Sequence, residues 1–149
     1  MLRAHSWKFL RANEGMASIE FAILGSLLIV MLVFALDFSL ALVNGMQVEN
    51  AAQAGAQYAA VHGWDSAAIT SAALSATPSP DITISPSNFC GCPSASGIAT
   101  ASCNSVCSDG STAGTYVSVS ATRNYATFLQ YPGLPESFTL SSVSTVRIK

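Results

Sequence analysis

An apolar segment near the N-terminus, with a single carboxylate at its head, constrains this chain more than any other feature. Residues Phe21 to Leu36 form a run of sixteen without a charged side chain, and apolar character resumes after Asp37 as far as Val43. A stretch of this kind is fit to cross the roughly 30 Å hydrocarbon core of a membrane as a helix. A charge in the bilayer core costs roughly 2.5–3.5 kcal/mol on insertion scales. Glu20, directly before the run, therefore either has a function or a partner, or lies in the headgroup region and is simply solvated.

The overall composition is typical of a membrane or secreted chain. Of 149 residues, 50% are apolar and only 9% are charged, and the net charge of −2 argues against a strongly basic, nucleic-acid-binding protein. Three basic residues (Arg3, Lys8 and Arg11) precede the apolar run, whereas the next basic residue is Arg123. Under the positive-inside rule, we expect a single-pass protein with a cytoplasmic N-terminus and an exterior C-terminal part.

A cleaved secretory signal peptide is the competing interpretation of the same segment, because it also combines a basic leader with an apolar stretch. Ser39 and Ala41 have the spacing of a signal-peptidase site. The acids Glu20 and Asp37, and an apolar run longer than the usual seven to fifteen residues, argue against it. Under this alternative the product is a secreted soluble binding or adhesion domain.

Residues 16 to about 61 are expected to form one helix, since no proline interrupts them and Leu, Ala, Met, Glu and Gln dominate. Such a helix is roughly 70 Å long, so its second half must project beyond the membrane, with Glu20 and Asp37 each near one interface. Gly63 is a plausible C-cap. Asp65 or Ser66 is expected to cap a second, short helix that ends before Pro78.

The C-terminal half has the pattern of strands. Residues 82–84 and 116–120 have strand signals, residues 138–148 read as one strand or two, and residues 131–135 form a turn. The segment 85–115, rich in Ser, Gly, Pro and Cys, is expected to be a loop without regular structure. The predicted fold class is therefore α+β, with a long transmembrane helix, a second short helix and a small antiparallel sheet domain with a Cys-stapled loop.

Small residues recur every four positions on the projecting half of the long helix. They form two adjacent stripes that would let another backbone approach closely. The surface that packs there is either the chain's own C-terminal sheet or another subunit. The two stripes are Ala51, Gly55 and Ala59, and Ala52, Ala56 and Ala60.

All four cysteines fall within eighteen residues, at Cys90, Cys92, Cys103 and Cys107. In an oxidising exterior compartment, an even cluster of this kind predicts disulfides. Pairing Cys90 with Cys92 would close a strained ring, so two cross-loop pairings remain. Zinc binding and redox catalysis are less favoured alternatives, because gaps of one and three residues fit neither a typical zinc site nor Cys-x-x-Cys.

Catalysis has little support in the sequence. One of the two histidines, His5, lies in the leader, and His62 lies at a helix end. No nucleophile elbow, phosphate-binding loop, dinucleotide fingerprint or metal-binding helix is present in the sequence. We expect a protein that is not an enzyme, with no cofactor, no metal and no small-molecule substrate.

The region around the carboxylate resembles a known family. The segment Gly15-Met16-Ala17-Ser18-Ile19-Glu20-Phe21 is similar to the processing site of type IV pilins and pseudopilins. With Asp37-Phe38, the polar stretch 44–50 and the Ala-rich stretch 51–60, residues 14–60 resemble the TadE-like proteins of the tight-adherence (Flp) pilus assembly system.

This resemblance implies a function. A prepilin peptidase would cut between Gly15 and Met16, and Glu20 with Phe21 would serve recognition or assembly, Glu20 by pairing with the amine of Met16 on a neighbour. The expected partners are the membrane, prepilin peptidase and other pilus-assembly proteins or pilin subunits, in the bacterial inner membrane. The alternative to the pilus role, besides secretion, is a simple single-span anchor. The expected parts are leader 1–15, transmembrane segment 16–43, periplasmic helical part 44–77 and exterior domain 78–149.

Overall fold

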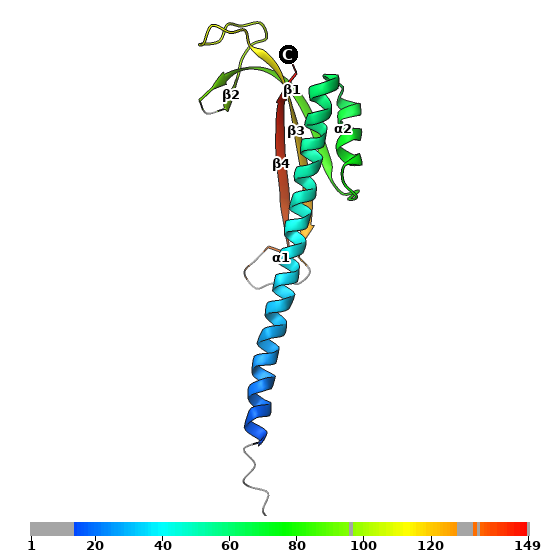
Figure 1. Cartoon of the computed structure of the whole chain (residues 1–149), viewed down its shortest axis with the longest axis vertical. Coiled ribbons are helices and arrows are strands. Elements are labelled where there is room, and N and C mark those ends of the chain that lie inside the picture. The colour runs from blue at the N-terminus through cyan, green and yellow to red at the C-terminus, as the bar shows by residue number, and fades with distance from the viewer. Residues whose placement is uncertain (1–13, 96, 128–132, 134, 149) are drawn as a thin grey trace, which may run out of the picture. The chain divides into compact units, whose positions relative to one another are not determined.

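The computed structural model describes residues 14–95, 97–127, 133 and 135–148. Two helices are followed by four strands, and the chain divides into two compact units, Met1–Ser39 and Leu40–Lys149. The α+β class predicted from the sequence is confirmed. The elements are α1 (Glu14–His62), α2 (Ser66–Ser75), β1 (Thr83–Ser94), β2 (Gly97–Thr100), β3 (Gly114–Ala126) and β4 (Ser137–Arg147) (Figure 1).

Local sequence chemistry sets the boundary between the two helices. Gly63 has φ +81°, a conformation that glycine adopts without strain, and its N–H donates to the Ala59 carbonyl at 2.9 Å. Asp65 is extended, and its Oδ1 accepts the N–H groups of Ala67 and Ala68, each at 3.1 Å. These contacts satisfy backbone donors that the first turn of α2 leaves open, so Asp65 is the N-cap.

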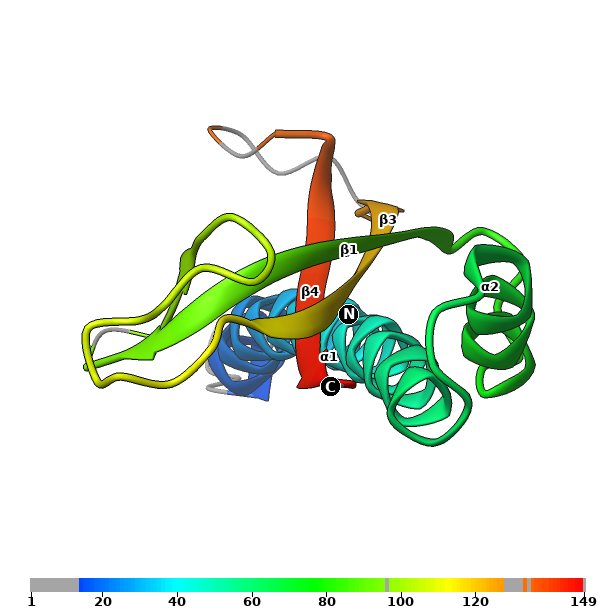
Figure 2. The same ribbon diagram turned by 90° about the horizontal axis from the view of Figure 1, so that it is seen from above.

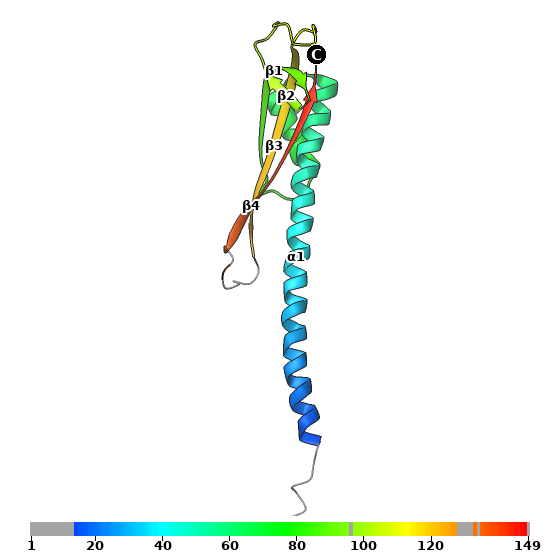
Figure 3. The ribbon, with the colours of Figure 1, turned by 90° about the vertical axis from the view of Figure 1, so that its left-hand side faces the viewer.

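The four strands form one antiparallel sheet in the order β2-β1-β3-β4. Strand β3 lies inside the sheet, with Val119 opposite Pro86 of β1 and opposite Ser144 of β4. Figures 2 and 3 show β1, β3 and β4 on one side of the distal part of α1, and α2 beside that part of the helix. One face of the sheet is therefore covered by helix.

The core of the second unit lies between α1, α2 and this sheet face. We call it the helix–sheet core. Because most of its α1 members are alanines, the helix axis can lie close to the strands. The fully or nearly fully buried members are Val48, Ala51, Ala52, Ala56 and Ala59 of α1, Ile69 of α2, Ile82, and Val117, Val119 and Ala121 of β3.

The prediction that residues 85–115 lack regular structure is wrong for their first half. Strand β1 continues to Ser94 and pairs with β3 from Thr83 to Gly91, and β2 then pairs back onto β1. Ser, Pro and Gly have low strand propensity, but strand propensity depends on context, and pairing with β3 outweighs it here. Because β2 covers only the end of β1, Pro86 lies on a sheet edge, where proline is tolerated.

The C-terminal segment forms one strand, β4, which resolves the alternative of one long strand or two short ones. From Leu140 onward, its side chains alternate between half-buried even positions and exposed odd positions. The half-buried Leu140 and Val146 pack against the helix–sheet core. The predicted turn at 131–135 lies outside the described residues except for Gly133 and Pro135.

Candidate functional site

The apolar segment of α1 is the most unusual surface of the chain. Among the described residues, α1 is the one helix that is long and apolar enough to cross a membrane. Its large apolar side chains are exposed, with Phe21 at 79% and Leu36 at 66%. Exposing so much apolar surface to water is unfavourable, whereas a lipid environment removes the penalty.

The two serine hydroxyls of this segment are hydrogen-bonded within the helix. Ser26 Oγ donates to the Ile23 carbonyl at 2.8 Å, and Ser39 Oγ donates to the Ala35 carbonyl at 2.7 Å. In hydrocarbon, an unsatisfied polar group costs several kcal/mol, so these bonds make both hydroxyls compatible with lipid. The segment therefore has the chemistry of a membrane anchor.

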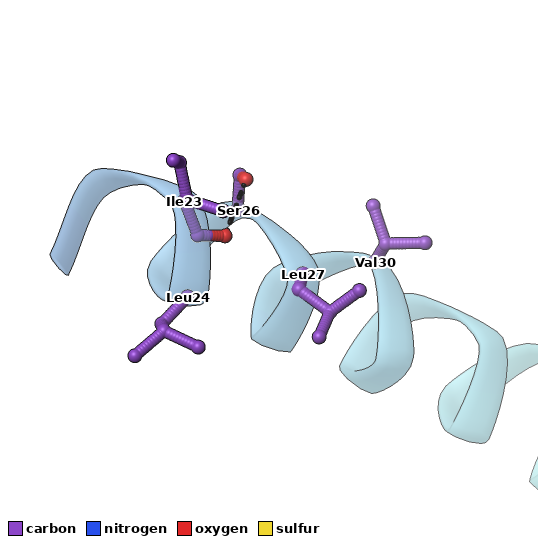
Figure 4. Close-up of a pocket in the computed structure, with 5 residues that line it drawn as sticks. All are labelled: Ile23, Leu24, Ser26, Leu27 and Val30. Atoms are coloured by element: carbon purple, nitrogen blue, oxygen red, sulfur yellow. Dashed lines mark hydrogen bonds between the residues drawn. The ribbon is translucent and has the colours of Figure 1, made fainter. Parts of the chain in front are cut away.

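An open depression lies on this part of the helix. Figure 4 shows the Ser26 hydroxyl turned to the helix backbone, while the aliphatic side chains spread outward. A surface of this kind suits acyl chains or another apolar helix better than a polar ligand. The depression is lined by Ile23, Leu24, Ser26, Leu27 and Val30.

The residues predicted for processing and assembly lie at the start of α1. Gly15 and Met16 are in its first turn, and the Met16 side chain lies outside the described part of the structure. Glu20 and Phe21 are both exposed, one turn further along. An exposed Glu20 is accessible to a partner, and its predicted role in recognition or assembly stays a prediction.

Asp37 has a different environment. It is 5% exposed, whereas its neighbours Leu36 and Phe38 are 66% and 58% exposed. A buried carboxylate is unfavourable without compensating polar contacts, so this burial distinguishes Asp37 from Glu20. Its predicted position at a membrane interface stays a prediction.

The two stripes of small residues face the chain's own sheet and α2. Five of the six residues are buried, and Ala60 is exposed. At Gly55, an added Cβ would lie 3.0 Å from Val119 Cγ1 and 3.2 Å from Ala73 Cβ. Of the two surfaces considered from the sequence, the structure places the intramolecular one against this face.

The sequence reasoning missed a polar cluster around Arg123, which we call the Arg123 cluster. Arg123 Nη1 donates to Asn44 Oδ1, to Gln47 Oε1 at 3.2 Å and to Ser79 Oγ at 2.6 Å. Nη2 lies 3.8 Å from the exposed Asp81 carboxylate. The cluster links α1 and the segment after α2 to β3. In the sequence, its one indication is Arg123 itself, a single charged residue in a strand that has no other.

All four cysteines form disulfides, in one of the two cross-loop pairings left open by the sequence. Cys90 pairs with Cys103 and Cys92 with Cys107, with Cα atoms 5.1 and 5.6 Å apart. Cys90 and Cys92 lie on β1, so the two bonds fasten the irregular segment between β2 and β3 to a strand. No group of metal-binding side chains is found in the part of the chain that the structure describes.

Comparison with known proteins identifies the helical part. The family model described as TadE-like protein matches residues 15–57. The chain matches no curated protein and no solved structure. The matched stretch begins at Gly15, includes Glu20, Phe21 and Asp37, and ends in the small-residue face. The TadE-like family implies involvement in Tad pilus assembly, and the match over residues 15–57 confirms the resemblance found in the sequence.

Proposed function

We propose that this chain is a membrane-anchored, pseudopilin-like and non-enzymatic component of Tad pilus assembly, acting through contacts of its N-terminal helix with other subunits. One observation carries the proposal. The TadE-like match begins at the predicted cleavage point, Gly15, and includes the whole exposed apolar segment. A helix whose apolar side chains are exposed needs lipid before assembly and other subunits after it.

The proposal includes an orientation and a location. Arg3, Lys8 and Arg11 precede the segment, and the next basic residue is Arg123. This asymmetry supports a cytoplasmic N-terminus and a periplasmic second unit in the inner membrane. Two disulfides in the second unit agree with an oxidising compartment. A reporter that is active only outside the cytoplasm, fused after Lys149, should be active, and silence from a well-expressed fusion would reverse the orientation.

Processing is the central test. We expect the mature protein to begin at Met16, and Gly15→Leu to block this cut, because a bulky side chain would obstruct a peptidase that fits closely to the backbone. Gly25→Leu is the matched control, since a Cβ at Gly25 meets nothing within 4 Å. If Gly15→Leu leaves the mass of the mature protein unchanged, this result contradicts the pseudopilin role. A start near Leu42 would indicate a secreted domain, and an uncut chain a simple anchor.

The proposed role of Glu20 is to pair with the terminal amine of Met16 on a neighbouring subunit. Low polarity in the membrane would favour this pairing, because an unpaired charge there is costly. Glu20→Ala should leave insertion intact and impair pilus assembly. Glu49→Ala, which removes another exposed carboxylate of α1, is the control. Normal pili in the Glu20→Ala strain would show that Glu20 is simply solvated.

A further inference from the structure

The interleaved pairing of the four cysteines sets a requirement on how the second unit acquires its disulfides. Along the chain, the first cysteine pairs with the third and the second with the fourth, as Cys90–Cys103 and Cys92–Cys107, which we call the native pairing. The alternative pairing, Cys90–Cys107 with Cys92–Cys103, joins the same two short segments. Chain entropy governs which pairing forms first, and the fold governs which one persists.

Chain entropy does not distinguish the two pairings. The native bonds span 13 and 15 positions, and the alternative bonds would span 17 and 11. The cost of closing a flexible loop rises only with the logarithm of its length, so Cys103 should react with Cys92 faster than with Cys90 by a factor of only about 1.3. In the unfolded chain, the two pairings are therefore expected in comparable amounts.

The fold selects the native pairing through backbone contacts on β1. Cys90 and Cys92 are two positions apart on this strand, so their side chains lie on the same face of the sheet. The Ala101 N–H donates to the Cys90 carbonyl at 2.9 Å, which holds the chain leading into Cys103 beside Cys90. Pairing Cys103 with Cys92 instead would require a shift of two residues, about 7 Å, along β1 and would cost this hydrogen bond.

The fourth cysteine is held by a turn of its own. The Cys107 N–H donates to the Ser111 carbonyl at 2.7 Å, and Val106 forms an isolated bridge with Thr112. With these contacts in place, the Cα atoms of the two native pairs lie 5.1 and 5.6 Å apart, within the range that a disulfide requires. The native pairing is therefore a property of the folded sheet and not of the local sequence.

The element that sorts the cysteines is synthesised after them. Strand β1 is poor in strand-forming residues and is a strand because it pairs with β3, with Cys90 opposite Thr115. Strand β3 follows all four cysteines in the sequence, so all four thiols emerge before it does. On the exterior side, where the proposed function places this unit, an oxidant meets the thiols before the sheet exists.

We propose that the second unit is a substrate of a thiol–disulfide isomerase, a dithiol protein that converts the alternative pairing into the native one. The preceding oxidation transfers four electrons and four protons from the four thiols to a disulfide oxidant of that compartment. The isomerisation itself is redox-neutral, because it begins and ends with two disulfides in the chain and a free thiolate on the isomerase.

Three exchange steps complete the conversion. The isomerase thiolate attacks Cys103 Sγ, breaks the Cys92–Cys103 bond, forms a mixed disulfide with Cys103 and releases the Cys92 thiolate. Cys92 then attacks Cys107 Sγ, which forms the Cys92–Cys107 bond and releases the Cys90 thiolate. Finally, Cys90 attacks Cys103 Sγ in the mixed disulfide, which forms the Cys90–Cys103 bond and releases the isomerase thiolate.

Burial in the folded unit protects the final state from further exchange. Cys90 and Cys107 are 8% and 7% exposed, so each native bond has one buried cysteine. A thiolate must reach a disulfide sulfur in order to attack it, so burial slows exchange. The exchange is therefore expected to stop at the native pairing.

The test in solution uses the full chain in detergent, where membrane orientation has no influence. Reduced chain is oxidised with diamide in concentrated urea, refolded without free thiol, and mapped by non-reducing mass spectrometry with electron-transfer fragmentation. Both pairings are expected in comparable amounts, and a catalytic amount of reduced protein disulfide isomerase should convert the mixture to the native pairing. Native pairing alone before the isomerase is added, or a mixture that the isomerase leaves unchanged, overturns the proposal.

Two double variants, each lacking one disulfide, isolate the competing pairs. Cys92→Ser with Cys107→Ser leaves the native pair Cys90–Cys103, and Cys90→Ser with Cys107→Ser leaves the alternative pair Cys92–Cys103. In urea, their oxidation equilibria with glutathione should agree within about 1.3-fold. Under refolding conditions, the native pair should be favoured about fivefold or more, the equivalent of one hydrogen bond. Equal equilibria under refolding conditions overturn the selection by the fold.

The role of an isomerase is tested in cells with and without the disulfide isomerase of the compartment. Its loss should lower the share of native pairing in the wild-type chain. The variant with Cys92→Ser and Cys107→Ser should not be affected, because it has only one possible intramolecular pairing. Unchanged native pairing in the wild-type chain overturns the need for an isomerase. Four free thiols in both strains would instead overturn the proposed exterior location, on which the role in cells rests.

Discussion

Substituting Gly55 by alanine has two opposing effects of similar size on the free energy of unfolding: a gain in helix propensity and a loss from overpacking. Alanine is more favourable than glycine in a helix interior by about 0.8–1.0 kcal/mol. The new methyl group, however, would lie 3.0 Å from Val119 Cγ1, 3.2 Å from Ala73 Cβ and 3.4 Å from Ile69 Cγ2. Overpacking of a well-packed core costs about 1–3 kcal/mol.

The neighbours of Gly55 decide which effect is larger. Val119 and Ile69 are fully buried, one held by the register of β3 and the other by the position of α2. Because neither side chain can move aside without displacing a neighbouring element, the packing penalty should exceed the helix gain. We expect Gly55→Ala to lower the free energy of unfolding by about 0–2 kcal/mol.

Gly45 offers a matched control on the same helix. A Cβ at Gly45 meets nothing within 4 Å, so Gly45→Ala should raise the free energy of unfolding by about 0.8–1.0 kcal/mol. The two substitutions are chemically identical, so the difference between them isolates the packing penalty at Gly55. Thermal unfolding of the full chain in detergent, followed by near-ultraviolet circular dichroism, reports on the helix–sheet core.

A double-mutant cycle with Val119→Ala tests the contact directly. Removing Val119 Cγ1 relieves the closest contact, so the two substitutions together should cost less than the sum of each alone, by about 1 kcal/mol. Equal stabilisation by Gly55→Ala and Gly45→Ala, or a coupling energy near zero, would refute the close packing of α1 on β3.

Three further predictions concern other polar and covalent contacts. Arg123→Leu removes the guanidinium that donates to Asn44, Gln47 and Ser79 and should lower the free energy of unfolding by about 1–3 kcal/mol, with a smaller loss for Arg123→Lys. Reduction of the disulfides of Cys90 and Cys92 should loosen the segment between β2 and β3 before the long helix unfolds, since closing a 15-residue loop contributes roughly 3 kcal/mol. Faster amide hydrogen exchange in that segment is the expected observation. A hydrogen bond from the Ser111 hydroxyl, with one from its backbone N–H, lowers the pKa of Asp109. The ionised carboxylate therefore stabilises this turn fully at pH values above the ordinary carboxyl pKa, and this contribution is lost as the pH falls through the lowered pKa. NMR titration of Asp109, with Asp109→Asn for comparison, measures the effect.

The helical half could be predicted from the sequence because its signals are local. The absence of proline, the glycine at 63 and the carboxylate of Asp65 each act within one turn of the chain. The family resemblance and the physical argument also agree there, because the apolar segment and Glu20 belong to the matched family motif and are also the residues that indicate a membrane-spanning helix. The alternating sequence pattern of β3 likewise predicted which of its side chains face the core.

The remainder depends on contacts distant in sequence. Strand β1 contains Pro86 and several serines, and only its pairing with β3, about thirty residues away, makes it a strand. Arg123 hydrogen-bonds to side chains that lie 44 to 79 positions away in the sequence, a separation that no local sequence pattern reveals. The disulfide pairing has the same character, since the strand position of Cys90 and Cys92 determines which partners they reach.

The intramolecular use of the small-residue face limits which surfaces remain for other subunits. Once Ala51, Gly55 and Ala59 pack on the sheet, another helix cannot occupy the same face without displacing the helix–sheet core. The proposed subunit contacts through α1 must then use the exposed apolar segment, which lies within the TadE-like match.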